Sequence, residues 1–396
     1  MERTLKLLLV AGEPSGDAHA ADLVNALRDA APDVKFEFFG GTGPQMREAG
    51  VESVVKTDEL AIIGLVEEAK ALPRFWRAFK ALRAAGAERR PDAVILVDWP
   101  DFNLRLATAF KRRGLQVIYY ISPQLWAWRS YRARNIRRDI DLLLSILPFE
   151  SDWYAQRGIE QVEYVGNPLT GTVHARYGRT EFCRRHNLHT GLPIIALLPG
   201  SRRHEVTHIL PVMLEAAALI LRDQPQVQFV LPLAPNRQTK DIEAFIAAQP
   251  TVAARLAVTQ DAMRETVAAA DVAAVASGTA TLETALLGVP LVVVYKTSLL
   301  NWHTLGRLIN VAHISLVNLI AGERLAPELL QNDFTAERLA KELLRLLEPQ
   351  ANALFTAQLH EAMEKLGHGA ASQRAAQAIL QKIDKTVTSH KMAGGE

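Results

Sequence analysis

Cysteine is almost absent from this chain of 396 residues, which contains Cys183 alone. A single thiol cannot close an internal disulfide, so the sequence is typical of a protein from a reducing compartment. It also excludes a zinc site built on cysteines, because such sites place several sulfur or histidine ligands at short spacing. The 11 histidines form no HExxH or comparable pairing. We therefore predict neither a bound metal nor a cofactor.

Net charge and long apolar runs are also scarce. Lysine and arginine total 45 against 43 acidic residues, a formal net charge of +2. Proteins that coat nucleic acid need a concentrated positive field, so that class is excluded as the main function. No window holds the roughly 18 uninterrupted apolar residues of a membrane-spanning helix, and no leader-like segment precedes the strand-like run at 5–10. The composition predicts a cytoplasmic protein, soluble or peripherally bound to a membrane.

Short apolar segments alternate with amphipathic helices along the whole chain. This alternation is typical of parallel sheets that helices cover on both faces. It restarts at Pro193, and the hydrophobic content of 49% is ample for two cores. The predicted strands are 6–11, 35–39, 93–97 and 116–121 in the first half, and 194–198, 227–231, 272–275 and 291–295 in the second.

The predicted fold class is α/β, with two Rossmann-like, doubly wound parallel-sheet domains. The N-terminal domain would cover 1–180 and the C-terminal domain 181–383, with the junction in the polar stretch 171–192. Whether the terminal helices pack on the N-terminal domain is left open. Small and polar residues with a glycine-rich end predict a disordered tail over 384–396. Ligands of such sheets bind beyond the carboxyl ends of the strands, so function is sought in the loops there.

One turn of the second half has the composition of a phosphate site. Ser277-Gly278-Thr279 lies between a predicted strand and a helix. Such a turn exposes backbone N–H groups at the positive end of the helix dipole. Glu283, one turn later, could accept hydrogen bonds from ribose hydroxyls. The alternative is that Ser277 and Thr279 only cap the helix and Glu283 completes a capping arrangement.

A second turn, Pro199-Gly200-Ser201-Arg202, follows the first strand of the same predicted sheet. Gly200 lets the backbone approach a ligand, and the Arg202 guanidinium can offer two parallel hydrogen bonds to phosphate oxygens. A surface turn with a solvated arginine is the alternative. Because both turns end strands of one sheet, we expect them to face one ligand, a nucleoside diphosphate.

The first half lacks the G-x-G-x-x-G of a dinucleotide site, and its glycine loop, 12–17, is a weak match. Polar residues instead follow the buried strand 93–97, where they are costly without partners. We predict that Asp98 is a general base that takes a proton from an attacking hydroxyl. Asp101 suits the cap of the next helix, 104–113. The alternative is that either aspartate only caps that helix.

Two further segments suggest contacts with a charged or apolar partner. The run 124–138 interleaves aromatic residues with arginines, which suits nucleic acid, anionic lipid or a phosphorylated sugar, with a solvated helix face as the alternative. The stretch 60–79 sets an apolar stripe beside lysine and arginine, which suits a membrane interface, although such a stripe is more often an ordinary core face. The arginines are Arg129, Arg132, Arg134, Arg137 and Arg138, and the stripe includes Ile62, Leu65, Val66, Leu72 and Trp76.

In this order the motifs resemble those of the lipid-A-disaccharide synthases, over nearly the whole chain. The most specific are Pro-Gln-Leu-Trp-Ala-Trp at 123–128 and Gly-Ser-Arg at 200–202. The other matching stretches are 12–17, 40–43, 64–67, 98–103, 165–168 and 277–283.

The resemblance implies an inverting, metal-independent glycosyltransferase of GT-B architecture, acting in lipid A (lipopolysaccharide) biosynthesis. It would join UDP-2,3-diacylglucosamine to 2,3-diacylglucosamine 1-phosphate (lipid X), making a β-1,6-linked disaccharide and UDP. The acceptor would enter the N-terminal domain, with Asp98 as its base. The residues that would hold UDP in the C-terminal domain are Arg202, Ser277, Gly278, Thr279, Glu283 and Asn318.

The resemblance also implies a peripheral protein of the inner face of the inner membrane, and a homodimer with exchanged C-terminal segments. Two other functions remain open. A UDP-sugar 2-epimerase shares the architecture and the UDP site but needs no acceptor. A non-catalytic module that binds phosphorylated glycolipid would leave the phosphate turns of the second half unexplained. A disaccharide product excludes the first, and release of UDP excludes the second.

Overall fold

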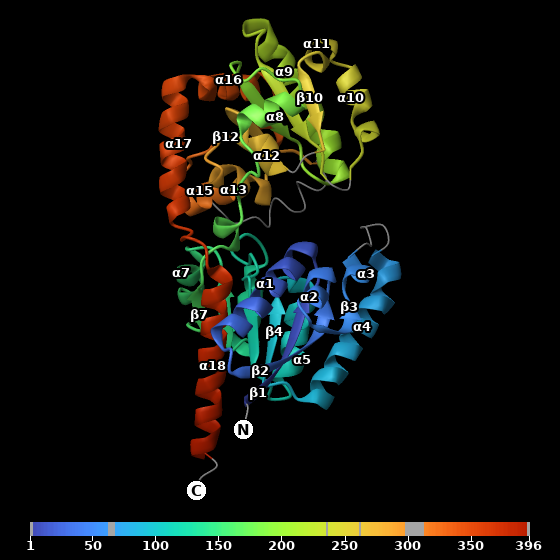
Figure 1. The fold of residues 1–396 in the computed structure, drawn as a ribbon, viewed down its shortest axis with the longest axis vertical. Helices are drawn as coiled ribbons and strands as arrows, with labels where there is room; N and C mark the ends of the chain where they lie inside the picture. The colour runs from blue at the N-terminus through green and yellow to red at the C-terminus, as the bar shows by residue number, and fades with distance from the viewer. Residues whose placement is uncertain (1–2, 62–67, 235–236, 261–262, 298–312, 394–396) are drawn as a thin grey trace. The chain divides into compact units, whose positions relative to one another are not determined.

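The structure, a computed structural model, describes residues 3–61, 68–234, 237–260, 263–297 and 313–393. The chain divides into two compact units (Figure 1). The first comprises Met1–Pro168 with His368–Glu396, and the second comprises Leu169–Gly367. Each unit holds one parallel sheet with helices between its strands, which confirms the predicted pair of doubly wound α/β domains.

Seven parallel strands form the sheet of the first unit, in the order β3-β2-β1-β4-β5-β6-β7. They are β1 Arg3–Ala11, β2 Val34–Thr42, β3 Glu52–Lys56, β4 Ala93–Val97, β5 Val117–Tyr120, β6 Leu142–Ser145 and β7 Val162–Tyr164. The helices are α1 Pro14–Ala30, α2 Pro44–Glu48, α3 Asp58–Ala61, α4 Glu68–Arg89, α5 Pro100–Lys111, α6 Ala133–Asp139, α7 Glu150–Ala155 and α18 Ala371–Ala393. The order reverses between β1 and β4, so the loops that follow these two strands border the crevice where ligands of such sheets bind.

Successive side chains of the central strands enter two different cores. On β1, Leu7 and Leu9 lie in the core that includes residues of α1 and α18, whereas Leu8 and Val10 lie in the core that includes residues of α4, α5 and α6. Successive strand residues point to opposite faces, and both faces here are covered by helices. This explains why these strands are continuously apolar in the sequence.

The second unit has a sheet of six strands in the order β10-β9-β8-β11-β12-β13. They are β8 Ile194–Leu198, β9 Gln228–Pro232, β10 Leu256–Thr259, β11 Val272–Ala276, β12 Leu291–Tyr295 and β13 Glu328–Leu330. The helices are α8 Arg179–Arg185, α9 Arg203–Asp223, α10 Glu243–Ala247, α11 Pro250–Ala253, α12 Met263–Ala268, α13 Thr279–Leu286, α15 Leu316–Ala321, α16 Ala336–Leu347 and α17 Pro349–Glu364. Here the order reverses between β8 and β11, the two strands that precede the predicted phosphate turns.

Helix α9 is, among the described residues, the one helix long and apolar enough to cross a membrane by length and composition. More than half of its apolar window, 56%, is buried inside the protein. Its buried residues include Ile209, Leu210 and Met213, and the helix packs against α16 and the sheet. We therefore interpret α9 as a core helix of the second unit.

The boundary between the units differs from the predicted one at 180/181. The first unit ends at Pro168, because the stretch that follows is tied to the second unit. Arg176 contacts Glu265 at 2.6 Å, and Arg179 contacts Asp271 at 2.8 Å. The polar composition of this stretch therefore marks a linker that is bonded to the second unit through Arg176 and Arg179.

The chain returns to the first unit at its end, where α18 packs against α1. The prediction of a disordered tail from 384 is wrong for residues 384–393, because α18 continues to Ala393. No glycine or proline interrupts this stretch before Gly394. Arg3 pairs with Asp384 at 2.5 Å, and Gln116 donates to Thr386 at 2.8 Å, so the helix is also held by the sheet it crosses.

Candidate active site

A pocket of about 860 Å³ lies at the carboxyl ends of β8, β9 and β11 in the second unit. Leu198, Pro232 and Ala276, the last residues of these strands, line it. Because the strand order reverses between β8 and β11, the helices that follow these strands leave a crevice there. The volume is within the range of pockets that hold small molecules and cofactors, roughly 300–1,000 Å³.

Most of the predicted nucleotide-binding residues line this one pocket. They are Arg202, Ser277, Gly278, Thr279 and Glu283. The turns that follow β8 and β11 are therefore neighbours, as their position at the ends of adjacent strands predicts. The pairing of β8 with β11, in which Val275 lies opposite Leu198, aligns the two strand ends.

Helix α13 opens at the pocket without a side-chain cap. Its N-cap residue is Gly278, and neither Ser277 nor another side chain caps the helix. A side chain at Gly278 would meet no atom within 4 Å, so the turn is open on this side. The capping alternative therefore does not describe this turn. The first N–H groups of α13 form the positive end of a helix dipole, which favours an anion.

Glu283 is held by an arginine of the neighbouring helix. Arg264 of α12 donates to Glu283 Oε1 from Nε at 2.9 Å and from Nη2 at 2.7 Å. Both donors reach the same oxygen, so among the described contacts the other oxygen is left to accept from a ligand hydroxyl. Arg264 also lines the pocket, where its guanidinium forms an ion pair with Glu283.

The turn after β8 is organised by Glu205. One oxygen of this carboxylate accepts from the N–H groups of Ser201 and Arg202, each at 3.0 Å. A Cβ at Gly200, where φ is +104°, would lie 2.4 Å from the same oxygen, so only glycine fits. The amides of this turn are therefore already bonded, and its contribution to an anion is the Arg202 guanidinium. That side chain is 73% exposed, and its one ion pair with a described residue is long, 3.4 Å to Glu205.

Asn318 is not part of this pocket. Its amide nitrogen donates to the Ala326 carbonyl and to Glu328, and its amide oxygen accepts from the Ala326 N–H at 2.7 Å. The side chain is fully buried in α15, so it fixes the segment that precedes β13. Both polar atoms of the Asn318 amide are thus bonded inside the protein, and Asn318 does not occupy the predicted position beside the nucleotide pocket.

Sequence reasoning missed further charged residues that line the pocket. Arg176 comes from the linker and pairs with Glu265 of α12. Burial is the largest single influence on the pKa of Glu265 and would raise it. The hydrogen bond from the Arg176 side chain, the hydrogen bonds from backbone N–H groups and the Arg176 charge together hold that pKa below its usual value. Arg176 and Arg264 reach the pocket only because α12 and the linker fold over the strand ends. No local motif predicts that placement.

In the first unit, Asp98 lies at the switch point between β1 and β4. Asp98 and Trp99 have φ values of +48° and +52°, a left-handed conformation that is unfavourable for residues with a side chain. The Asp98 carbonyl accepts from the Tyr119 hydroxyl at 2.6 Å and from Asn103 at 2.8 Å, which holds this backbone in place. Strained residues of this kind cluster at functional sites.

The loop after β1 packs directly against this segment. A Cβ at Gly12 would lie 2.0 Å from the Trp99 ring, so only glycine allows the approach. Burial raises the pKa of Asp98 to about 6, the negative charge of Glu13 adds to the rise, and the Trp99 N–H opposes it. A carboxylate with a pKa of this size is well matched to general-base catalysis close to neutral pH.

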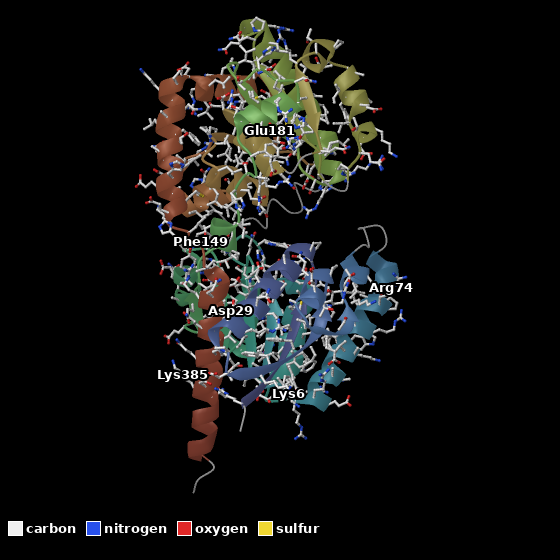
Figure 2. The ribbon with its side chains drawn as sticks, in the orientation of Figure 1. Lys6, Asp29, Arg74, Phe149, Glu181 and Lys385 are labelled. Carbon is white, nitrogen blue, oxygen red and sulfur yellow. The ribbon has the colours of Figure 1, made fainter. Side chains whose placement is uncertain are left out.

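We expect the activity of the protein to fall as the pH drops through about 6, because protonated Asp98 cannot accept a proton. Glu13→Gln removes a negative charge next to Asp98, so it should lower the Asp98 pKa and move the acid limb of kcat to lower pH. Asp29→Asn, at the far end of α1 (Figure 2), is the matched control and should leave the limb in place. If the acid limb of the pH profile of kcat stayed in place in Glu13→Gln, the assignment of Asp98 as the general base would be contradicted.

Asp101 does not cap a helix, contrary to prediction. Helix α5 begins at Pro100 instead of 104, which places Asp101 inside its first turn. Asp101 instead pairs with Arg129 at 2.9 Å and Arg132 at 2.7 Å. These contacts tie the basic segment after β5 to the segment that carries Asp98.

The comparisons with known proteins agree over nearly the whole chain. The sequence profile of the family described as lipid-A-disaccharide synthetase matches residues 7–383. The lipid-A-disaccharide synthase of Geobacter sulfurreducens is 43% identical over 384 residues, which is 96% of this chain and 98% of that protein.

The chain belongs to the lipid-A-disaccharide synthase family.

Solved structures of other families share the fold. A UDP-GlcNAc 2-epimerase from Neisseria meningitidis, bound to UDP-GlcNAc, has a TM-score of 0.62 at 11% identity, over 95% of this chain and 100% of that one. The calicheamicin glycosyltransferase CalG4 has a TM-score of 0.59 at 15% identity, over 97% of this chain and 99% of that one. At these identities the likeness concerns architecture alone. Membership of the lipid-A-disaccharide synthase family makes the chain a glycosyltransferase of lipid A biosynthesis.

The Pro-Gln-Leu-Trp-Ala-Trp motif of this member of the lipid-A-disaccharide synthase family is divided between core and surface. Trp126 is buried and donates to Glu150 at 3.0 Å, while Trp128 is exposed and lies under the Arg129 guanidinium at 4.1 Å. Glu150 is fully buried, which raises its pKa to about 7, and the hydrogen bond from Trp126 opposes that rise. The motif therefore anchors the basic segment through Trp126.

The structure describes only some of the side chains of the predicted membrane stripe. Ile62, Leu65 and Val66 lie outside the described residues. On α4, Leu72 is 66% and Trp76 is 55% exposed, which is unusual for large apolar side chains. Phe79, by contrast, packs edge-on against Phe102 in the core. The stripe therefore divides into a buried end and an exposed end.

Proposed function

We propose that the chain transfers 2,3-diacylglucosamine from UDP-2,3-diacylglucosamine to the 6-hydroxyl of 2,3-diacylglucosamine 1-phosphate. A bond forms between the acceptor O6 and C1 of the donor sugar, while the bond from C1 to the UDP oxygen breaks. The acceptor proton passes to Asp98, and UDP leaves with the bonding electron pair. The observation that carries the proposal is that two turns suited to a diphosphate line one pocket, in a chain of this family.

The leaving UDP gains negative charge, and the residues of this pocket supply its counterpart. The uncapped start of α13 offers N–H groups, and Arg202 and Arg264 offer guanidinium groups. Stabilising charge at the leaving group in this way is usually the largest contribution to such catalysis. Glu283, fixed by Arg264, suits the hydroxyls of the ribose.

Incubation with both acylated substrates tests the proposal. We expect UDP and the disaccharide lipid to appear in equal amounts, and neither product without the acceptor. UDP-GlcNAc alone provides the test of the alternative, because a 2-epimerase would convert it to its 2-epimer without any acceptor. Epimerised sugar nucleotide, or an absence of disaccharide, would refute the transferase proposal.

We further propose that the protein works on the inner face of the inner membrane, held there peripherally through α4. Leu72 and Trp76 offer an exposed apolar surface, and Lys80, whose ammonium group lies 5.2 Å from the Trp76 ring, suits anionic headgroups. Aromatic and basic residues of this kind are typical of helices that lie in a membrane interface. Acyl chains on both substrates require such a location.

Replacing both exposed residues by serine, Leu72→Ser with Trp76→Ser, should release the protein from vesicles that contain phosphatidylglycerol. Sedimentation with the vesicles measures this, and we expect roughly tenfold weaker binding because two apolar contacts are lost. The melting temperature should not fall, because both side chains are exposed. A large fall in melting temperature with unchanged sedimentation would instead favour a role in packing.

A further inference from the structure

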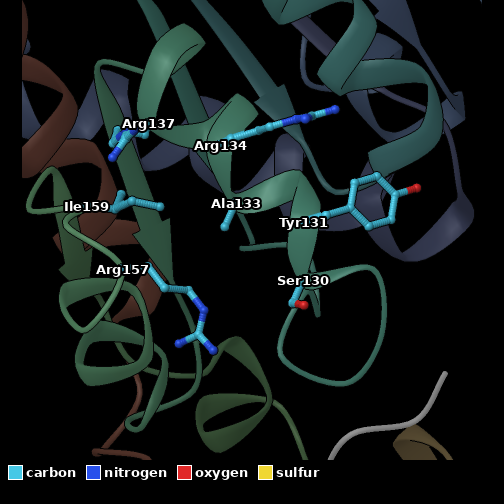
Figure 3. Close-up of a pocket in the computed structure, with 7 residues that line it drawn as sticks. All are labelled: Ser130, Tyr131, Ala133, Arg134, Arg137, Arg157 and Ile159. Carbon is cyan, nitrogen blue, oxygen red and sulfur yellow. The ribbon is translucent and has the colours of Figure 1, made fainter.

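A second hollow, of about 340 Å³, lies beside α6 in the first unit. We call it the arginine groove. Figure 3 shows its lining residues, with Arg137, Arg157 and Ile159 on one side, Tyr131 and Arg134 on the other and Ala133 between them. They come from the short 3₁₀ helix Ser130–Arg132, from α6, and from the loop between α7 and β7. None of these described lining residues is acidic.

The structure divides the five arginines of the basic segment into two groups. Arg129 and Arg132 pair with Asp101, and Arg138 pairs with Asp139 at 2.6 Å. Arg134 and Arg137 line the arginine groove and are exposed. Among the described residues, the structure gives neither guanidinium a carboxylate partner.

A third guanidinium joins them from a distant part of the sequence. Arg157 lies over the Trp153 ring at 3.8 Å and donates one N–H to the Trp153 carbonyl at 2.9 Å. The stacked side chain is thereby positioned before any ligand arrives, and its other N–H groups are directed away from that carbonyl. Three arginines therefore border one hollow whose described lining holds no acidic residue, and the positive potential that they create favours binding of an anion.

The chemistry of the groove matches a phosphate monoester on a sugar. Guanidinium groups bind phosphate oxygens through paired N–H donors and hold a dianion better than single donors do. Ser130 adds a hydroxyl, Tyr131 adds a ring that is 61% exposed, and Ala133 and Ile159 add a buried apolar floor. A volume of 340 Å³ has room for a sugar phosphate but little more.

We propose that the arginine groove binds the phosphate of the sugar acceptor, through Arg134, Arg137 and Arg157. This inference rests on the proposed function, which supplies an acceptor with a phosphate at C1. The groove belongs to the same unit as the candidate base: along the chain, Ser130 and Tyr131 lie between Arg129 and Arg132, whose guanidinium groups bind Asp101, three residues after Asp98. A phosphate held there would orient the acceptor relative to the carboxylate that removes its proton.

The test replaces the three arginines by alanine, singly and together, with Arg105→Ala on α5 as an exposed control in the same unit. Steady-state kinetics in neutral mixed micelles give KM for each substrate. We expect the acceptor KM to rise roughly tenfold for each arginine removed, because each loses a charged hydrogen bond. The donor KM and the melting temperature should change little. Arg157→Lys should recover only part of the loss, because lysine lacks the planar fork.

Direct binding separates this inference from the proposed function. Calorimetry with glucosamine 1-phosphate should show binding to the original protein, weaker binding to the triple variant, and no comparable binding of glucosamine to either. If the protein makes disaccharide but the triple variant keeps its acceptor KM, the inference is wrong and the function stands. If no disaccharide forms while glucosamine 1-phosphate still binds through these arginines, the function fails and the site stands.

A membrane phospholipid is the other source of phosphate, and it predicts a different result. In that case the triple variant would lose binding to phosphatidylglycerol vesicles relative to phosphatidylcholine vesicles, while both KM values in neutral micelles stayed the same. That outcome would overturn the acceptor site.

Discussion

Asp98→Asn should abolish sugar transfer and at the same time make the first unit more stable at pH 8. Asparagine keeps the shape of the side chain but cannot accept the acceptor proton, so the rate of UDP release should fall by about 10²–10⁴. Affinity for UDP, measured by calorimetry, should not change, because the pocket at β8 and β11 contains no part of Asp98.

The gain in stability follows from the direction of the pKa shift. Folding raises the pKa of Asp98 from about 3.9 in an unfolded chain to about 6. The ionised carboxylate therefore costs the folded state free energy, on the order of 1–3 kcal/mol. This cost is absent below pH 4, where both states are protonated, grows between about 4 and 6, and is complete above 6. Asparagine removes it.

Melting curves at pH 8 and pH 4 check the sign: the variant should melt higher than the original protein at pH 8, and the difference should vanish at pH 4. Asp101→Asn is the matched control, because it lies in the same segment and is 59% exposed. It should retain most transfer activity and gain no stability. Normal turnover in Asp98→Asn would refute the assignment of the base.

Arg202→Ala should reduce kcat by about 10²–10³, the loss found when a single donor that stabilises developing charge is removed. The leaving diphosphate would then rely on Arg264 and the start of α13 alone. Arg202→Lys should recover only part of the rate, because an ammonium group cannot offer two parallel hydrogen bonds. Rates of UDP release at saturating acceptor measure both effects.

Arg203 provides the control for this experiment. It is the next residue, is also exposed, and does not line the pocket, so Arg203→Ala should have little effect. The melting temperature of Arg202→Ala should also stay close to that of the original protein, since the side chain is 73% exposed and its one ion pair with a described residue is long. Equal losses in the two variants would indicate a general effect of charge and contradict a specific role for Arg202.

Most of the central strands could be predicted from the sequence because both of their faces are buried, although β6, which is also fully buried, is not among the predicted strands. Those at 93–97, 194–198 and 291–295 match the structure to the residue, since continuous apolar runs leave little ambiguity. Edge strands β3, β7 and β10 are short and only partly buried, so they lack that signal. The positions of these edge strands depend on hydrogen bonds to the neighbouring strand of the sheet. A local sequence pattern does not contain that information.

The candidate sites divide in the same way. Ser277 and Arg202 follow strands that are easily recognised, and the rule for parallel sheets brings them together. Arg157, Arg176 and Arg264 have no local motif, and only the folded chain carries them to a pocket. The pairing of Asp101 with Arg129 and Arg132 likewise joins residues far apart in sequence, so which arginines of the basic segment remain open to a ligand could not be predicted.

Helix α18 has a consequence for the order in which the protein folds during synthesis. Its residues Ala375, Ala376, Ile379 and Ile383 belong to the same core as β1, so the core that α1 begins to form on one face of the first sheet stays incomplete until the ribosome has made them. By then every residue of the second unit has been translated, and units generally fold as they emerge. The unit whose synthesis starts first is therefore completed last, and a nascent chain carries a partly uncovered apolar sheet face for most of its time on the ribosome.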